Sequence, residues 1–267
     1  MEVPQLVSCE WLKERLDSGT LANIVILDVS WASTKDCKDE YNKQHIPGAR
    51  YIDVMSGEHT DMFPRNLPTP ETFTEQAQKA GVNTDSHVIV YSNSDRAGYF
   101  IAGRGWWTFR ILGHTKVSIL DGGLLKWLQL EYPTTDKATD IQPGNFVASS
   151  EKSLYRSYDE VKDKNNTRNS RSNKLYLFIS ESHIPGAKNL FMTDLVDNEN
   201  GTLKSKNQLR ELFSAAGVDL TRPVVTHCNS GMSSCAVAFT AELLGADNIS
   251  VFHGGFTEWT KRQQAKQ

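Results

Sequence analysis

Cysteine is scarce in this sequence, and this scarcity excludes two classes of protein. Four cysteines in 267 residues are too few and too widely spaced for a disulfide-stabilised scaffold, so we expect a reducing compartment. No Cys-x-x-Cys pair and no paired-histidine spacing occurs, so we expect neither a bound metal ion nor a cofactor. The four cysteines are Cys9, Cys37, Cys228 and Cys235.

Long apolar runs and basic clusters are also missing. No apolar run approaches the ~20 residues of a membrane span, so we expect no contact with a membrane. The 29 Lys and Arg against 32 Asp and Glu give a net charge of −3, and no basic stripe recurs that would bind nucleic acid. Residues 1–6 lack the character of a presequence, so we expect a cytoplasmic protein, with the mitochondrion as the alternative.

The chain contains one long internal repeat. Five short motifs return in the same order, with offsets that drift only from 138 to 132 residues. A period this long indicates a duplicated domain, because each copy can bury a core of its own. The turn-rich segment 132–146 lies between the copies, so we predict domains over residues 1–140 and 141–267. The paired motifs are at 45–49 and 183–187, 80–82 and 216–218, 93–94 and 229–230, 112–113 and 244–245, and 122–127 and 254–259.

Short β-branched runs alternate with helix-like segments in both copies. Such alternation predicts an α/β fold in which each domain has a mainly parallel sheet with helices on both faces. Ligands of such sheets bind at the carboxyl ends of the strands, so the residues after Tyr91 and His227 are candidate site residues. The predicted strands are 23–28, 87–91, 116–121, 223–227 and 249–252, and the predicted helices are 71–79, 96–112 and 233–244.

Cys228 follows a predicted strand and precedes a small-residue loop and a helix. Loop amides and the helix N-terminus direct positive potential at a sulfur in this position. Such a setting lowers a thiol pKa and produces a nucleophilic thiolate near neutral pH. The first copy has Ser92 at the equivalent position, so we expect it to be catalytically silent and to shape the site from across the interface. Cys235 falls within the following helix, where we expect a structural role.

On these motifs the sequence resembles the two-domain rhodanese-like sulfurtransferases. His-Ile-Pro-Gly-Ala and Gly-Gly-x with a following Trp occur in both copies, whereas the loop Cys-x-Ser-Gly-x-x-x-Cys occurs only in the second. The resemblance implies two domains with five-stranded parallel sheets and a persulfide on the loop cysteine, here Cys228. A small-molecule sulfur donor would supply the sulfur, and a thiol such as thioredoxin or glutathione, or cyanide, would accept it.

The loop sequence favours one donor among the relatives. Members that use thiosulfate carry Arg and Lys directly after the cysteine, whereas this chain has the neutral Asn229 and Ser230. Cys228-Asn229-Ser230-Gly231 resembles the Cys-Gly-Ser-Gly loop of 3-mercaptopyruvate sulfurtransferases. Related phosphatases need an arginine six residues after the cysteine, and Ser234 stands there instead.

The resemblance also assigns roles around the loop. We expect Cys228 and Ser230 to be catalytic, with Ser230 either donating a hydrogen bond to the substrate carbonyl or only capping the helix. We expect loop amides to stabilise the anionic sulfur and bind substrate; these residues are Asn229, Gly231, Met232 and Ser233.

The match is weaker where the substrate carboxylate should bind. The family places an arginine after the first strand of the second domain, and the nearest candidate, Arg171, lies in a segment that is shortened before His183. It either reaches the site or belongs to a solvated loop. Arg65 occupies the position of a family histidine and is a second candidate carboxylate ligand. The alternatives are a thiosulfate sulfurtransferase or a non-catalytic rhodanese-like module that binds proteins.

Overall fold

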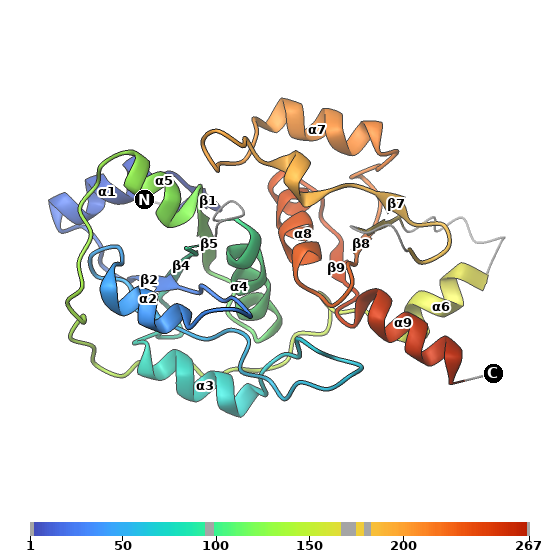
Figure 1. Ribbon diagram of the computed structural model, residues 1–267, viewed down its shortest axis with the longest axis horizontal. Helices are drawn as coiled ribbons and strands as arrows, with labels where there is room; N and C mark the ends of the chain where they lie inside the picture. Colours follow the sequence, from blue (N-terminus) through green and yellow to red (C-terminus); the bar gives the residue numbers. More distant parts are fainter. Residues whose placement is uncertain (1–2, 94–98, 167–174, 179–182, 266–267) are drawn as a thin grey trace.

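The computed structural model describes residues 3–93, 99–166, 175–178 and 183–265. The chain forms two α/β domains that lie side by side (Figure 1). The first contains β1 (Leu6–Val7), α1 (Cys9–Ser18), β2 (Ile24–Asp28), α2 (Cys37–Lys43), β3 (Arg50–Tyr51), α3 (Pro70–Lys79), β4 (His87–Tyr91), α4 (Phe100–Ile111), β5 (Val117–Leu120) and α5 (Gly123–Gln129). The second contains α6 (Tyr158–Asn166), β6 (Leu175–Phe178), β7 (Lys188–Asn189), the 3₁₀ helix η1 (Met192–Leu195), α7 (Lys206–Ala215), β8 (Val224–Thr226), α8 (Ser233–Leu243), β9 (Ile249–Val251) and α9 (Gly255–Gln264).

The first sheet is entirely parallel and buried on both faces. Its strand order is β1-β5-β4-β2-β3. Alternate residues of β4 enter different cores: Val88 and Val90 belong to the cluster that faces the second domain, and Ile89 and Tyr91 to the cluster on the opposite face. This alternation explains why the strand reads as an uninterrupted apolar run. The predicted class of fold is confirmed.

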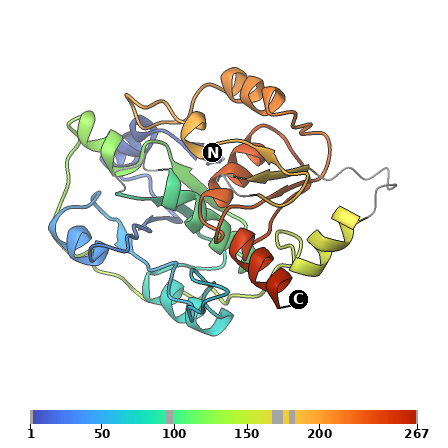
Figure 2. The ribbon, with the colours of Figure 1, turned by 45° about the vertical axis from the view of Figure 1, so that its right-hand side comes forward.

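The second sheet repeats this order with one strand fewer. Its described strands run β7-β6-β8-β9, which matches β3-β2-β4-β5 of the first domain. Where β1 pairs with β5, the second domain has only an isolated parallel bridge between Tyr155 and Val251. The expectation of five strands is therefore wrong for the described part of this domain, because the segment before α6 pairs with β9 at a single position. Figure 2 shows α6 beside α9, where the rings of Tyr158 and Trp259 lie 5.5 Å apart.

The segment between β6 and β7 is shortened, as the sequence predicted. Residues 29–49 join β2 to β3 and include α2, whereas only residues 179–187 join β6 to β7. The described part of this connection, 183–187, forms a turn. In the first copy, His45 of the equivalent motif contacts Tyr41, with Nδ1 2.7 Å from the Tyr41 carbonyl oxygen.

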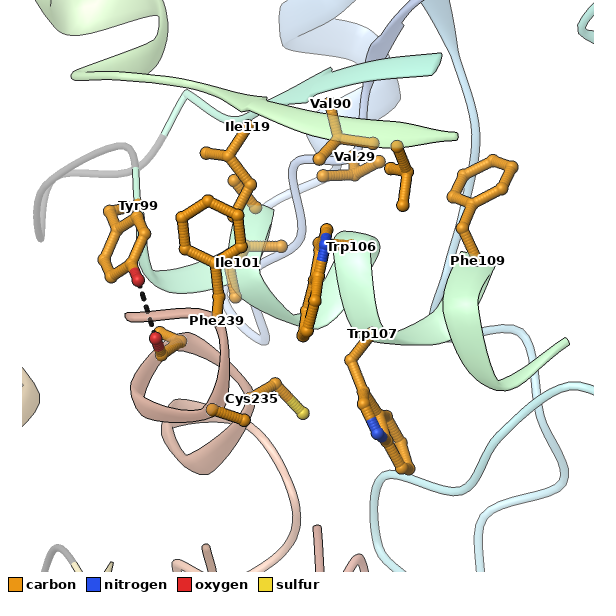
Figure 3. Close-up of a cluster of buried hydrophobic side chains, with 14 of the residues drawn as sticks. Val29, Val90, Tyr99, Ile101, Trp106, Trp107, Phe109, Ile119, Cys235 and Phe239 are labelled. Atoms are coloured by element: carbon orange, nitrogen blue, oxygen red, sulfur yellow. Dashed lines mark hydrogen bonds between the residues drawn. The ribbon is translucent and has the colours of Figure 1, made fainter. Parts of the chain in front are cut away.

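The two domains share one core through helices α4 and α8. The same apolar cluster includes residues of β4, α4, α8 and β9. Figure 3 shows Trp106 of α4 next to Phe239 of α8, with ring centroids 5.3 Å apart, and a hydrogen bond between Tyr99 and Thr240. The helices approach closely at Gly103, where a methyl group would lie 2.6 Å from the Cα of Ala236. The predicted start of this helix at residue 96 falls outside the described residues, and the described helix begins at Phe100.

Residues 130–157, all of them described, connect the domains without a helix or strand. They pass α3, where the amide of Gly144 donates to the carbonyl of Gln78 and that of Phe146 to Val82. Within the described residues, no helix combines the length and apolar composition needed to cross a membrane.

Asp121 joins the domains at the end of β5. Its carboxylate accepts a hydrogen bond from the Leu203 amide of the second domain at 2.8 Å. Burial raises the pKa of Asp121 to about 6, although the amides of Leu203 and Gly122 oppose this shift.

We expect Asp121→Asn to stabilise the protein at pH 7 by about 1–2 kcal/mol, because the neutral amide avoids the cost of a buried charge. Because the carboxyl pKa is higher in the native state than in the unfolded chain, protonation of Asp121 stabilises the native state. This stabilisation is complete below pH 3.8 and is lost as the pH rises through about 6. The gain should therefore vanish near pH 4. Thermal unfolding at both pH values measures this difference, and equal effects of the substitution at pH 4 and pH 7 would contradict it.

Candidate active site

Cys228 lies in the loop between β8 and α8, at the carboxyl edge of the second sheet. The carbonyls of Cys228 and Asn229 point to the start of α9, where they accept hydrogen bonds from the amides of Phe256 and Thr257 at 2.8 and 3.0 Å. The amide of Met232 points inward and donates to Cys228 Sγ at 3.1 Å. The Ser234 hydroxyl donates to the same sulfur at 3.5 Å. The loop therefore surrounds the sulfur with donors.

These donors change the acidity of the thiol. Burial raises the pKa of Cys228, but hydrogen bonds from Ser234, from the Ser233 hydroxyl and from the Ser230 backbone outweigh it, and the pKa is lowered from its ordinary value. The sequence predicted this direction from the loop amides and the helix N-terminus. The contribution of the Ser234 hydroxyl was missed, because the sequence was examined at that position only for a phosphate-binding arginine.

Cys235 has the structural role that the sequence predicts. Its side chain has no exposed surface, and burial raises the pKa of its thiol to about 12. Its Sγ donates to the Gly231 carbonyl oxygen at 3.3 Å. Figure 3 shows this sulfur at the interface of the two helices. A thiol in this state is not a nucleophile near neutral pH.

A cleft of about 560 Å³ opens above Cys228 between the two domains. Its lining includes Cys228, although only 5% of this residue is exposed. From the second domain come Cys228, Asn229, Ser230, Met232 and Ser233; from the first come 31–35, Arg65, Asn93, Phe100 and Ile101. The predicted residue Gly231 is not in the lining and contributes backbone only. Its φ is +73°, and a methyl group there would lie 2.5 Å from His253, so a side chain at this position would clash.

Arg65 reaches this cleft from the loop between β3 and α3. Its Nη1 donates to Ser230 Oγ at 3.0 Å, and its guanidinium lies 5.4 Å from the centre of the Trp31 ring. Two groups fix its backbone carbonyl: Arg104 Nη2 at 3.1 Å and His253 Nε2 at 3.0 Å. Burial lowers the pKa of His253 to about 3, as does the nearby charge of Arg104, so the imidazole is a neutral donor.

The other sequence-predicted arginine, Arg171, lies outside the described residues. Several lining residues of the first domain were not predicted from the sequence. Trp31 and Lys35 are among them, and Lys35 forms an ion pair with Glu40 at 2.7 Å. Both follow β2, at the carboxyl edge of the first sheet. The rule that directed attention to the residues after Tyr91 and His227 applies equally to this strand and would have found them.

The described part of the chain contains no group of three or more His, Cys, Asp or Glu side chains arranged to hold a metal ion. The groups that remain for chemistry are the thiol, the hydroxyls, the main-chain amides and the two cations of the cleft.

Comparison with known proteins identifies the family of the chain. The family model for the rhodanese-like domain matches residues 8–130 and again residues 157–262. The chain belongs to the rhodanese family. Its fold superimposes on the rhodanese fold of SseA from Escherichia coli, described as a 3-mercaptopyruvate sulfotransferase, with a TM-score of 0.82, 30% identity and coverage of 95% and 99% of the two chains.

Rhodanese relatives that are named for two different sulfur donors are equally similar to the chain. Thiosulfate sulfurtransferase of Cricetulus griseus is 34% identical, covering 95% of this chain and 91% of the relative. 3-Mercaptopyruvate sulfurtransferase of Homo sapiens is also 34% identical, covering 96% and 92%. The protein is therefore a sulfurtransferase of the rhodanese family, and these relatives do not support the alternative of a non-catalytic binding module. Overall identity does not distinguish between the two donors.

Proposed function

We propose that the protein transfers sulfur from 3-mercaptopyruvate through a persulfide on Cys228 to a thiol acceptor such as thioredoxin or glutathione, or to cyanide. The observation that carries this proposal is the contact between Arg65 and Ser230 beside the sulfur. It places a hydroxyl and a permanent positive charge at the mouth of a loop that lowers the Cys228 pKa.

The first step forms the persulfide. The Cys228 thiolate attacks the sulfur of 3-mercaptopyruvate, a sulfur–sulfur bond forms, and the carbon–sulfur bond of the donor breaks. The bonding electron pair leaves with the carbon as the enolate of pyruvate, which takes up a proton. In the second step, the acceptor thiolate attacks the outer sulfur and releases the Cys228 thiolate. The inward-pointing Met232 amide and Ser234 hydroxyl stabilise the anionic sulfur that leaves in this step.

The Ser230 hydroxyl is suited to the enolate. Its oxygen accepts a hydrogen bond from Arg65, so its own proton remains available to an oxygen in the cleft. A carbonyl oxygen that gains negative charge as the carbon–sulfur bond breaks is such an acceptor. Thiosulfate has no carbonyl group, so this arrangement favours the keto acid.

Arg65 is suited to the carboxylate of the same donor. Guanidinium binds carboxylate through two parallel hydrogen bonds, and Arg65 has further N–H groups besides the one that it donates to Ser230. It takes the position of the family histidine. The first domain thus supplies the cation that the neutral Asn229 of the loop does not.

Thiosulfate is the second candidate donor, because Lys35 and Arg65 together place two cations in the lining of the cleft. This pair suits a dianion, even though the basic residues that thiosulfate-using relatives carry in the loop are absent from 229–230. The two donors can be compared directly.

The decisive experiment measures thiocyanate formation from cyanide with each donor. We expect kcat/KM for 3-mercaptopyruvate to exceed that for thiosulfate by about tenfold or more, and Arg65→Gln to raise KM for 3-mercaptopyruvate by roughly 10- to 100-fold, the value of a charged hydrogen bond. Arg222→Gln is the matched control, because Arg222 lies in a separate pocket of the second domain. Equal or better use of thiosulfate, or an unchanged KM in Arg65→Gln, would overturn the donor assignment.

A further inference from the structure

One peptide group of the catalytic loop contacts the nucleophile on one side and a buried arginine on the other. The Met232 amide donates to Cys228 Sγ at 3.1 Å, and the Gly231 carbonyl oxygen accepts from Arg104 Nη1 at 2.8 Å. These two groups belong to the same planar trans peptide, in which C=O and N–H point in opposite directions. A group that fixes the carbonyl therefore also fixes the direction of the N–H.

Arg104 is an unusual residue for this position. It lies on α4 of the first domain, none of its surface is exposed, and it is not in the lining of the cleft. It also donates to the carbonyls of Arg65 and Asn66 at 3.1 and 3.4 Å, and its guanidinium forms a hydrogen bond with the Cys235 sulfur. None of the ion pairs found within the described residues involves it.

A buried cation without a carboxylate needs another source of negative charge. Its carbonyl partners supply partial charges only. Two thiols, Cys235 and Cys228, also interact electrostatically with Arg104. Of these, Cys235 stays protonated because burial raises its pKa to about 12, whereas the pKa of Cys228 is lowered, so Cys228 is the thiol that ionises more readily.

We propose that Arg104 is a positioning residue of the sulfur-transfer reaction, which orients and polarises the 231–232 peptide so that its N–H holds the Cys228 sulfur as a thiolate. A cation on a carbonyl oxygen strengthens the N–H of the same amide as a donor. The inference rests on the proposed function in one respect, namely that Cys228 is the reacting sulfur.

Arg104 also connects the nucleophile to the donor-binding side of the cleft. The same guanidinium that fixes the Gly231 carbonyl fixes the backbone of Arg65, whose side chain contacts Ser230. Helix α4 is held in place by its close packing on α8 at Gly103. The first domain, which lacks a nucleophile of its own, therefore sets the geometry of the thiolate in the second.

The test is the pKa of Cys228, measured from the pH dependence of its alkylation by iodoacetamide and read by mass spectrometry of the Cys228 peptide. We expect Arg104→Met to raise this pKa by about one unit or more, which lowers the alkylation rate about tenfold at pH values below both pKa values while leaving the rate at high pH unchanged. Arg104→Lys should restore part of the shift, because it keeps the charge but loses the fork geometry.

Arg110→Met is the matched control. Arg110 lies on the same helix and also reaches the second domain, through Glu242 at 2.7 Å, but makes no contact with the loop. The control should keep the pKa of the unsubstituted protein. A folded Arg104→Met variant with the same Cys228 pKa as Arg110→Met would overturn the inference.

A measurement on the unsubstituted protein covers the case in which the Arg104 variants do not fold. In protein labelled with ¹⁵N at Arg and Met, the Arg104 Nη and Met232 amide resonances should titrate with the pKa found by alkylation. Absence of a coincident titration at either group would overturn the inference. An ordinary Cys228 pKa in the unsubstituted protein would instead contradict the proposed function, so the two failures are distinguishable.

Discussion

Cys228→Ser should abolish sulfur transfer, with a loss of roughly a thousandfold or more in kcat. The hydroxyl of serine stays protonated in the loop that ionises the thiol, because its intrinsic acidity is far lower. Its oxygen also forms no persulfide equivalent that an acceptor thiol could cleave. The variant should still fold, since the side chain is nearly isosteric and the Met232 amide can donate to the new oxygen at the same position.

Two measurements check this result. Thiocyanate formation reports turnover, and mass spectrometry after treatment with donor reports whether the protein gains one sulfur atom on the peptide that contains Cys228. Cys9→Ala is the control, because burial raises the pKa of this distant thiol to about 12 and it takes no part in the cleft. Turnover retained in Cys228→Ser, or sulfur found on a different cysteine of the unsubstituted protein, would refute the assignment.

The second large effect is expected at the crossing of the two interface helices. Gly103→Val introduces a branched side chain where even a methyl group would lie 2.6 Å from the Ala236 backbone. Because backbone cannot yield as a side-chain tip can, α4 and α8 must separate, at a cost of about 3 kcal/mol or more. In thermal unfolding this corresponds to a decrease in melting temperature of roughly 6–12 °C for a protein of this size.

Sulfur transfer should also fall in Gly103→Val, since the neighbouring Arg104 moves with the helix. Gly245→Ala serves as the control: its φ of +97° strains an alanine, but a methyl group there meets no atom within 4 Å. It should cost only about 1 kcal/mol and leave activity unchanged. A melting temperature for Gly103→Val equal to that of the control would show that the helix contact does not hold the domains together.

Much of the fold follows from patterns that are local in the sequence. The central strands β2 and β4 are apolar on both faces and are therefore continuous apolar runs. In the second copy the prediction located β8 and β9, the counterparts of β4 and β5, but not β6, the counterpart of β2. The two-residue edge strands were not predicted. β1, β3 and β7 have two residues each, and pairing with a neighbour rather than any intrinsic preference determines their conformation.

The candidate site, like the fold, was predicted only where its residues are close together in the sequence. Cys228 and its loop were predicted because strand, loop and helix are consecutive. Arg104 was not, since in the sequence it is one polar residue in an apolar helix, and its partners are 39 and 127 positions away. Nothing in the spacing of the chain relates these positions, and only the packing of one domain on the other brings them together.

The shared core of α4 and α8 has a consequence for how the chain behaves when it is divided. Either half expressed alone would present to water the apolar face that now contains Trp106 or Phe239, and would be prone to aggregate. We therefore expect one calorimetric transition, not two, on heating the full-length chain. The two repeats should therefore fold as one unit, and we expect only the intact tandem to transfer sulfur.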